Sequence, residues 1–165
     1  MGNKNNYAFI DGQNLHVSTC KFDWNFSYEK LMTFLKKNLY IEKAFYFIGF
    51  TEDRNCARYK ELRRIGFTLC LRKPVQRFIH GKLEIKANVD SNLITHSLIK
   101  IHKYDKAVII AGDGDYYFLA KYLLRNNKLH RLLVPCKSDC SNLFKNNIFR
   151  NHIAYLSRMK KALEK

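Results

Sequence analysis

Short apolar runs alternate with longer amphipathic segments along almost the whole chain of 165 residues. The apolar runs are nearly uninterrupted, which favours strands that are buried on both faces of a parallel sheet. Strands and helices that alternate in this way predict an α/β fold, in which helices flank a central, mostly parallel sheet on both faces. The expected strands cover residues 7–10, 44–50, 67–71, 107–111, 129–134 and 153–155.

The amphipathic segments between these runs predict helices with recognisable ends. Ser27 is a favourable N-cap for a helix over residues 28–38, because its hydroxyl can accept a hydrogen bond from a free backbone N–H. Gly66 follows a helix predicted over residues 55–65, where a left-handed C′ residue commonly ends a helix. Further helices are expected over residues 89–102, 116–125 and 141–145, with a loop or hairpin over residues 72–85.

The length of the chain fits a single domain over residues 1–165, closed by a basic helix at about residues 156–165. Lysine and arginine number 30 and aspartate and glutamate 14, so the formal net charge is +16. A charge of this sign and size predicts an anionic polymer as partner, and nucleic acid is the natural candidate. On composition alone, a lysine-rich solvated surface explains the charge equally well.

Several features predict a cytoplasmic protein. No run of 18 or more uncharged apolar residues occurs, so neither a transmembrane helix nor a membrane partner is expected. Residues 1–6 are polar and lead directly into the first predicted strand, so no signal peptide is expected. The 5 cysteines are odd in number and form no Cys-x-x-Cys pair, which indicates reduced thiols. Self-association into a homo-oligomer stays open.

Aspartates stand where two of the predicted strands end. Asp11 comes directly after the first strand, and Asp113 and Asp115 follow the fourth strand in the run Gly-Asp-Gly-Asp. A further acid, Asp90, opens the helix that precedes the fourth strand. The carboxyl ends of parallel strands meet at one edge of a sheet, where such folds bind ligands. We therefore expect these four side chains to gather at that edge.

A cluster of carboxylates needs a compensating positive charge. Two carboxylates about 4 Å apart repel by roughly 4 kcal/mol at an effective dielectric near 20, so a cluster is stable only when protonated, paired or metal-bound. Oxygen ligands select Mg²⁺ or Mn²⁺, and such an ion can polarise a phosphodiester and activate a water for attack. The alternative is that each Asp-Gly pair forms a turn, and that Asp113 and Asp115 cap the following helix.

Three short motifs carry these aspartates along the chain. They are Tyr-Ala-Phe-Ile-Asp-Gly-Gln-Asn-Leu at residues 7–15, Lys-Ala-Asn-Val-Asp at 86–90, and Ile-Ala-Gly-Asp-Gly-Asp-Tyr at 110–116. Together they resemble the NYN domain family, the LabA-like branch of the PIN-like nuclease superfamily, over nearly the whole chain. The resemblance implies a PIN-like three-layer fold and metal-dependent ribonuclease activity. By position, it assigns Asp11, Asp90, Asp113 and Asp115 to the metal-binding and catalytic acids, and Asn14 to their polar helper.

Three positions depart from the pattern of the resembled family. Relatives often have Ser before the Gly-Asp-Gly-Asp run, where this chain has Ala111. Many relatives carry another acid in the helix that Asp90 opens, whereas this chain has Asn92 and His96 there. At about 100° per residue, both side chains point away from Asp90. We interpret His96 as a packing or hydrogen-bonding residue rather than a metal ligand.

A basic segment lies between the third strand and the helix that begins near Asp90. Arg72, Lys73, Arg77, Lys82 and Lys86 fall within a stretch that contains one acid, Glu84. A loop of this charge beside an acidic edge can hold phosphates while a metal acts on one of them. We therefore predict that these five basic residues bind RNA, although an ordinary solvated hairpin would have the same composition.

Taken together, the sequence predicts a hydrolase: an endoribonuclease that depends on Mg²⁺ or Mn²⁺ and cuts single-stranded RNA. The departures at Asn92 and His96 favour an alternative, an RNA-binding NYN module with weak or absent catalysis. A metal-dependent DNA nuclease is a third interpretation, because no motif in the chain distinguishes RNA from DNA.

Overall fold

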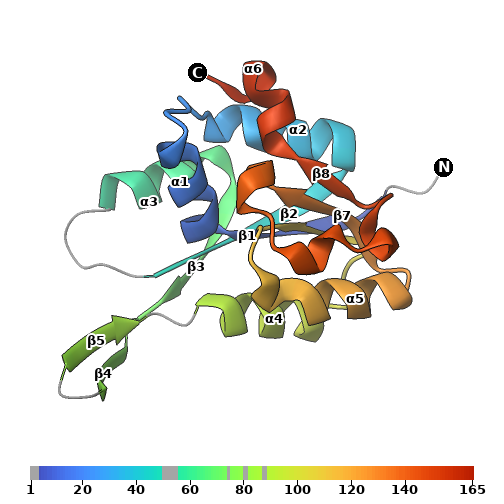
Figure 1. The fold of residues 1–165 in the computed structure, drawn as a ribbon. Helices are drawn as coiled ribbons and strands as arrows, with labels where there is room; N and C mark the ends of the chain where they lie inside the picture. Colours follow the sequence, from blue (N-terminus) through green and yellow to red (C-terminus); the bar gives the residue numbers. More distant parts are fainter. Residues whose placement is uncertain (1–3, 50–55, 74, 80–81, 87–88) are drawn as a thin grey trace.

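The computed structural model describes residues 4–49, 56–73, 75–79, 82–86 and 89–165, with the backbone alone at residues 56, 75–79 and 82–86. Among these residues, six parallel strands form one sheet in the order β3-β2-β1-β6-β7-β8 (Figure 1). The strands are β1 (Asn6–Asp11), β2 (Ile41–Gly49), β3 (Phe67–Arg72), β6 (Ala107–Ile110), β7 (Leu129–Val134) and β8 (Ile153–Tyr155). The predicted α/β class is confirmed.

Helices cover both faces of this sheet, which gives the fold three layers (Figure 1). One face is covered by α1 (Gly12–Lys21), α2 (Tyr28–Leu39) and α3 (Cys56–Ile65). The opposite face is covered by α4 (Val89–Ile99) and α5 (Tyr117–Arg125). The expected basic helix at the end of the chain takes the form of a 3-10 turn, Leu156–Met159, followed by the short α6, Lys160–Leu163.

The two helix ends that were predicted from capping residues form for the expected reasons. Ser27 Oγ accepts a hydrogen bond from the backbone N–H of Lys30 at 3.2 Å, so α2 begins at the next residue after Ser27. Gly66 has a φ of +111° directly after α3, a conformation that residues with a Cβ rarely adopt.

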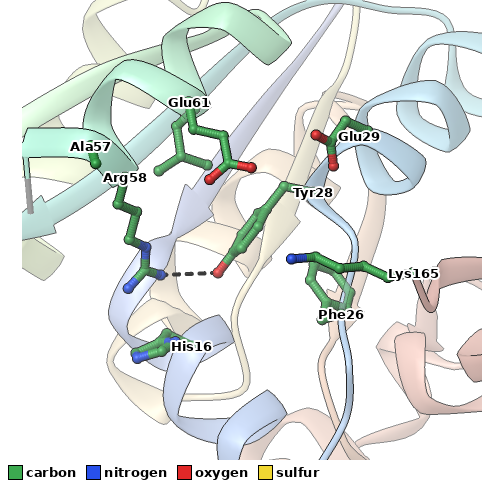
Figure 2. A pocket seen from close by; sticks show the side chains of 9 residues that line it. His16, Phe26, Tyr28, Glu29, Ala57, Arg58, Glu61 and Lys165 are labelled. Carbon is green, nitrogen blue, oxygen red and sulfur yellow. Dashed lines mark hydrogen bonds between the residues drawn. The ribbon is translucent and has the colours of Figure 1, made fainter.

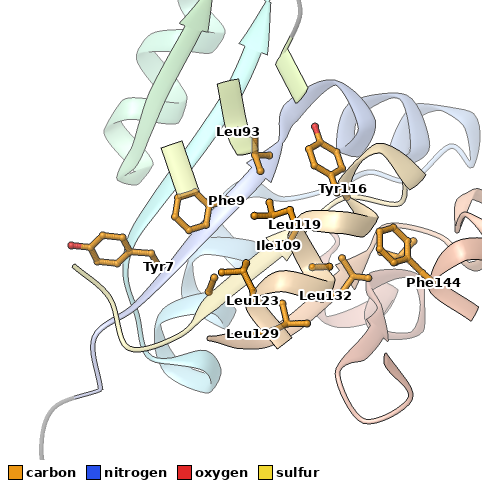
Figure 3. Packing of buried hydrophobic residues seen from close by; sticks show 14 of the residues in the cluster. Tyr7, Phe9, Leu93, Ile109, Tyr116, Leu119, Leu123, Leu129, Leu132 and Phe144 are labelled. Carbon is orange, nitrogen blue, oxygen red and sulfur yellow. The ribbon is translucent and has the colours of Figure 1, made fainter. Parts of the chain in front are cut away.

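The strands send alternate side chains into two separate cores. Phe9 and Ile109 are buried on the face that α4 and α5 cover (Figure 3). Phe45 belongs to the same buried cluster. Ile10 and Tyr46 are fully buried on the face that α1, α2 and α3 cover. Because the central strands are packed on both sides, the segments that leave their carboxyl ends start from fixed points.

Some elements differ from those that the sequence predicts. The helix α1 is not among the predicted ones, and the helix predicted over residues 89–102 ends earlier, at Ile99. The segment predicted as a loop or hairpin is an antiparallel hairpin of β4 (Val75–Ile79) and β5 (Lys82–Lys86). Within the described ranges, no helix is long and apolar enough to cross a membrane, and the cysteines described there are free.

Candidate functional site

The strands β1 and β6 lie side by side at the centre of the sheet, and the chain leaves them in opposite directions. After β1 it crosses to β2 and β3, and after β6 it crosses to β7 and β8. In open α/β sheets, ligands bind at the carboxyl ends of the strands beside a switch of this kind. Residues 11–14 and 111–116 leave the two strands at this point, which we call the β1–β6 switch.

Asp11 is buried at the end of β1, with 5% of its surface exposed, and it begins α1 as the N-cap. Its Oδ1 accepts hydrogen bonds from the backbone N–H groups of Gln13 at 3.1 Å and Asn14 at 2.9 Å. Gly12 is required here, because a Cβ would lie 2.2 Å from Tyr46 Cε1. The carboxylate is therefore held in one orientation by its own helix.

The second oxygen of Asp11 meets Asp90 through a tyrosine. The Tyr116 hydroxyl lies 2.9 Å from Asp11 Oδ2 and 2.7 Å from Asp90 Oδ1. Tyr116 ends the 3-10 turn Gly114–Tyr116 and is completely buried, whereas Asp90 is half-buried in the first turn of α4. Two acids from distant parts of the chain thus converge on one hydroxyl group.

Burial dominates the electrostatics of this pair. It raises the pKa of the Asp11 carboxyl, and the charge of Asp90 adds to this, while the hydrogen bonds from Asn14, Tyr116 and Gln13 oppose it. Burial likewise raises the pKa of the Tyr116 hydroxyl, and the charges of the two acids raise it further. The phenol is therefore a neutral hydrogen-bond donor at physiological pH.

Asn14 joins the two segments that leave the β1–β6 switch. Its Oδ1 accepts a hydrogen bond from the backbone N–H of Gly112, the second residue after β6, at 3.0 Å. A Cβ on Gly112 would lie 2.6 Å from the carbonyl oxygen of Asp139, so only glycine fits this approach. The start of α1 and the segment after β6 are thus fixed relative to each other.

Asp113 and Asp115 lie after β6 but turn outward, and both are exposed. Asp113 caps the following 3-10 turn by accepting a hydrogen bond from the backbone N–H of Asp115 at 3.1 Å. In the part of the chain that the structure describes, no three His, Cys, Asp or Glu side chains form a group that could hold a metal ion. The donor set of Asp11 and Asp90 consists of hard oxygens that fit Mg²⁺ or Mn²⁺, and a hydroxyl stands where they converge.

His96, one of the departures from the family pattern, is half-buried and packs against two core phenylalanines. Its ring lies edge-on to Phe47 at 5.5 Å and to Phe45 at 6.3 Å. Burial lowers the pKa of the imidazole, and the charge of Lys100 lowers it further. These contacts agree with the interpretation of His96 as a packing residue.

The basic residues predicted to bind RNA lie along β3 and the hairpin that follows it. Arg72 and Lys73 are exposed where β3 ends. The side chains of Arg77, Lys82 and Lys86 fall outside the described residues, and only their backbone, in β4 and β5, is described. Figure 1 shows this hairpin extending away from the three-layer body.

A cavity of about 380 Å³ lies among α1, α2 and α3. Figure 2 shows Arg58 and Tyr28 facing each other in it, with Arg58 Nη2 donating to the Tyr28 hydroxyl at 3.0 Å. Tyr46 links this cavity to the first motif, since its hydroxyl donates to Gly12 O at 3.2 Å and lies 3.4 Å from the Tyr28 hydroxyl. Neither this cavity nor the position of the Tyr116 hydroxyl is predicted from the sequence. The only sequence signal for Tyr116 is that it directly follows Asp115 in the third motif.

Known proteins share both the sequence pattern and the fold. A family model described as "NYN domain" matches residues 7–147. The low amplitude and bright protein LabA of Synechococcus elongatus is 25% identical over 134 residues, which cover 76% of this chain and 70% of LabA. A crystal structure of a Vibrio parahaemolyticus protein of unknown function superimposes with a TM-score of 0.73 and 19% identity, covering 94% of this chain and 95% of that one. The chain belongs to the NYN domain family.

Proposed function

We propose that this protein is a divalent-metal-dependent endoribonuclease that hydrolyses phosphodiester bonds in single-stranded RNA. The observation that carries the proposal is the convergence of Asp11 and Asp90 beside the β1–β6 switch, at the edge where this fold class binds ligands. The chain belongs to the NYN family, which resembles PIN-like nucleases, and this membership supports a nuclease-type function.

Each residue beside the β1–β6 switch has a role in this proposal. Asp11 and Asp90 would hold Mg²⁺ or Mn²⁺, and the exposed Asp113 and Asp115 would orient the attacking water or bind the ion through water. Asn14 keeps the two outgoing segments together. A divalent ion bound there supplies polarisation of the phosphodiester and an activated water.

The net charge of +16 supplies the attraction for RNA. Arg72 and Lys73 are exposed beside the carboxyl edge, and we assign phosphate contacts to them together with Arg77, Lys82 and Lys86. Phosphate contacts of this kind position a strand without reading its sequence.

The test is incubation of labelled single-stranded RNA and DNA with the purified protein, in Mn²⁺ or in EDTA. RNA should be cut in Mn²⁺ but not in EDTA. Asp90→Asn or Asp113→Asn should abolish cutting while leaving RNA binding intact. Glu42→Gln is the matched control, because Glu42 is an exposed acid near the start of β2. Cutting of RNA by Asp90→Asn at the wild-type rate would refute the assignment.

A second candidate is an RNA-binding module without turnover. The observation that favours it is that Asp113 and Asp115 turn outward, so that no third acid joins Asp11 and Asp90 among the residues described. Salt-sensitive RNA binding without any cutting in Mn²⁺ would support this candidate. Cutting of DNA in preference to RNA would identify a DNA nuclease instead.

A further inference from the structure

The Tyr116 hydroxyl occupies the point where the two candidate metal ligands converge. It lies within 2.9 Å of both Asp11 Oδ2 and Asp90 Oδ1. A phenol carries one proton and can donate to one carboxylate at a time, so it cannot satisfy two ionised acids as a cation can. We propose that Tyr116 holds the place of the divalent ion in the metal-free protein and thereby limits how tightly that ion binds.

The ring of Tyr116 has little freedom to move away. It is completely buried and belongs to the core cluster on the α4–α5 side of the sheet. Figure 3 shows its hydroxyl pointing away from Ile109 and Leu119. The apolar part of the ring is thus anchored in the core, while the hydroxyl contacts the two acids. The turn that carries it is closely packed as well, since a Cβ on Gly114 would lie 2.8 Å from Ser141 Oγ.

A divalent ion therefore competes with this hydroxyl. An ion held by both acids would use Asp11 Oδ2 and Asp90 Oδ1, the same oxygens that accept the hydroxyl's hydrogen bonds. Binding then requires both hydrogen bonds to be given up. Tyr116 is a positioning residue in this scheme: it keeps Asp11 and Asp90 converged without the ion, at the cost of affinity for it.

Isothermal titration with Mn²⁺ at a fixed pH, on wild type and Tyr116→Phe, tests the proposal. Phenylalanine keeps the ring and deletes the competing hydroxyl, so Mn²⁺ should bind about tenfold more tightly. In EDTA the same variant should melt at a lower temperature than wild type, because nothing then joins the two acids.

Tyr104→Phe is the matched control. Its hydroxyl is also buried and donates to a backbone oxygen, that of Ser97, at 3.0 Å, away from the acids. This control should lose stability in EDTA yet bind Mn²⁺ with wild-type affinity. Unchanged affinity in Tyr116→Phe would reduce the residue to a structural role, and weaker affinity would make its oxygen a metal ligand; either result overturns the proposal.

A measurement on the unaltered chain covers the case in which Tyr116→Phe does not fold. With ¹³Cζ-labelled tyrosine, saturating Mg²⁺ should shift the Tyr116 resonance, since its hydroxyl loses both partners. Binding of Mg²⁺ without that shift contradicts the proposal.

The inference rests on the proposed metal-dependent function, yet the two fail separately. A protein that cuts no RNA but shows the change in Mn²⁺ affinity keeps the role of Tyr116 and loses the nuclease. Absence of Mn²⁺ binding in both wild type and Tyr116→Phe contradicts both.

Discussion

The hydrogen bond between Asn14 Oδ1 and the Gly112 N–H makes a quantitative prediction. Gly112 is buried, so Asn14→Ala leaves its N–H without the acceptor that it has in the structure. An unsatisfied buried donor costs about 1–3 kcal/mol. For a domain of this size each kcal/mol lowers the unfolding midpoint by about 2–4 °C, so the expected loss is about 2–12 °C. Alanine is the better helix former by up to about 0.7 kcal/mol, and this gain in stability offsets part of the loss.

Thermal unfolding followed by circular dichroism, in EDTA, measures this loss. Gln13→Ala is the matched control, because Gln13 is the exposed neighbour in the same helical turn. Asn14→Asp keeps an acceptor oxygen and should recover part of the stability, although it adds a charge beside Asp11. An Asn14→Ala midpoint equal to that of Gln13→Ala would show that this bond does not hold the two segments at the β1–β6 switch together.

Two further predictions follow from the charges. Since the folded state raises the pKa of Asp11, it binds that proton more tightly than the unfolded chain does, so metal-free stability should rise as pH falls through the folded pKa. Asp11→Asn should remove this component from melts recorded in EDTA; identical pH profiles would contradict it. Arg72→Ala should weaken RNA binding and reduce the slope of log K against log salt by about 1, measured by fluorescence anisotropy. Lys37→Ala, an exposed charge on α2, should leave the slope unchanged, and equal slopes for both variants would exclude a phosphate contact at Arg72.

The sheet was predictable because short apolar runs, such as Ala107–Ile110 of β6, alternate regularly with longer amphipathic segments. The helix α1 was not, since its buried positions include Ser18 and Thr19 beside Leu15, so its sequence lacks a clear apolar stripe. The hydroxyl of Thr19 accommodates burial by donating to the carbonyl oxygens of Leu15 and His16 within its own helix. A hydrophobicity pattern does not show that the hydrogen-bonding capacity of a buried hydroxyl is satisfied within its own helix.

The candidate site was predictable at the level of the sheet edge and no finer. The rule for parallel strands brings Asp11 and Asp113 to one edge, but the direction of each side chain depends on local hydrogen bonds. Asp11 turns inward to Tyr116, and Asp113 turns outward to cap its own turn. The role of Tyr116 depends on packing between α4 and the turn before α5, which spacing along the chain does not encode.

The central place of β1 also determines when the contact between Asn14 and Gly112 can form. Among the six strands of the sheet β1 comes first in sequence, yet one of its two neighbours, β6, follows much later, and 98 positions separate Asn14 from its partner Gly112. At about 5–20 residues per second, a ribosome needs roughly 5–20 s to cover that separation. Throughout this interval β1 lacks its neighbour β6, and Tyr116, which links Asp11 to Asp90, has not yet been synthesised. The contacts of the Tyr116 hydroxyl with Asp11 and Asp90 can therefore form only after residue 116 has been synthesised.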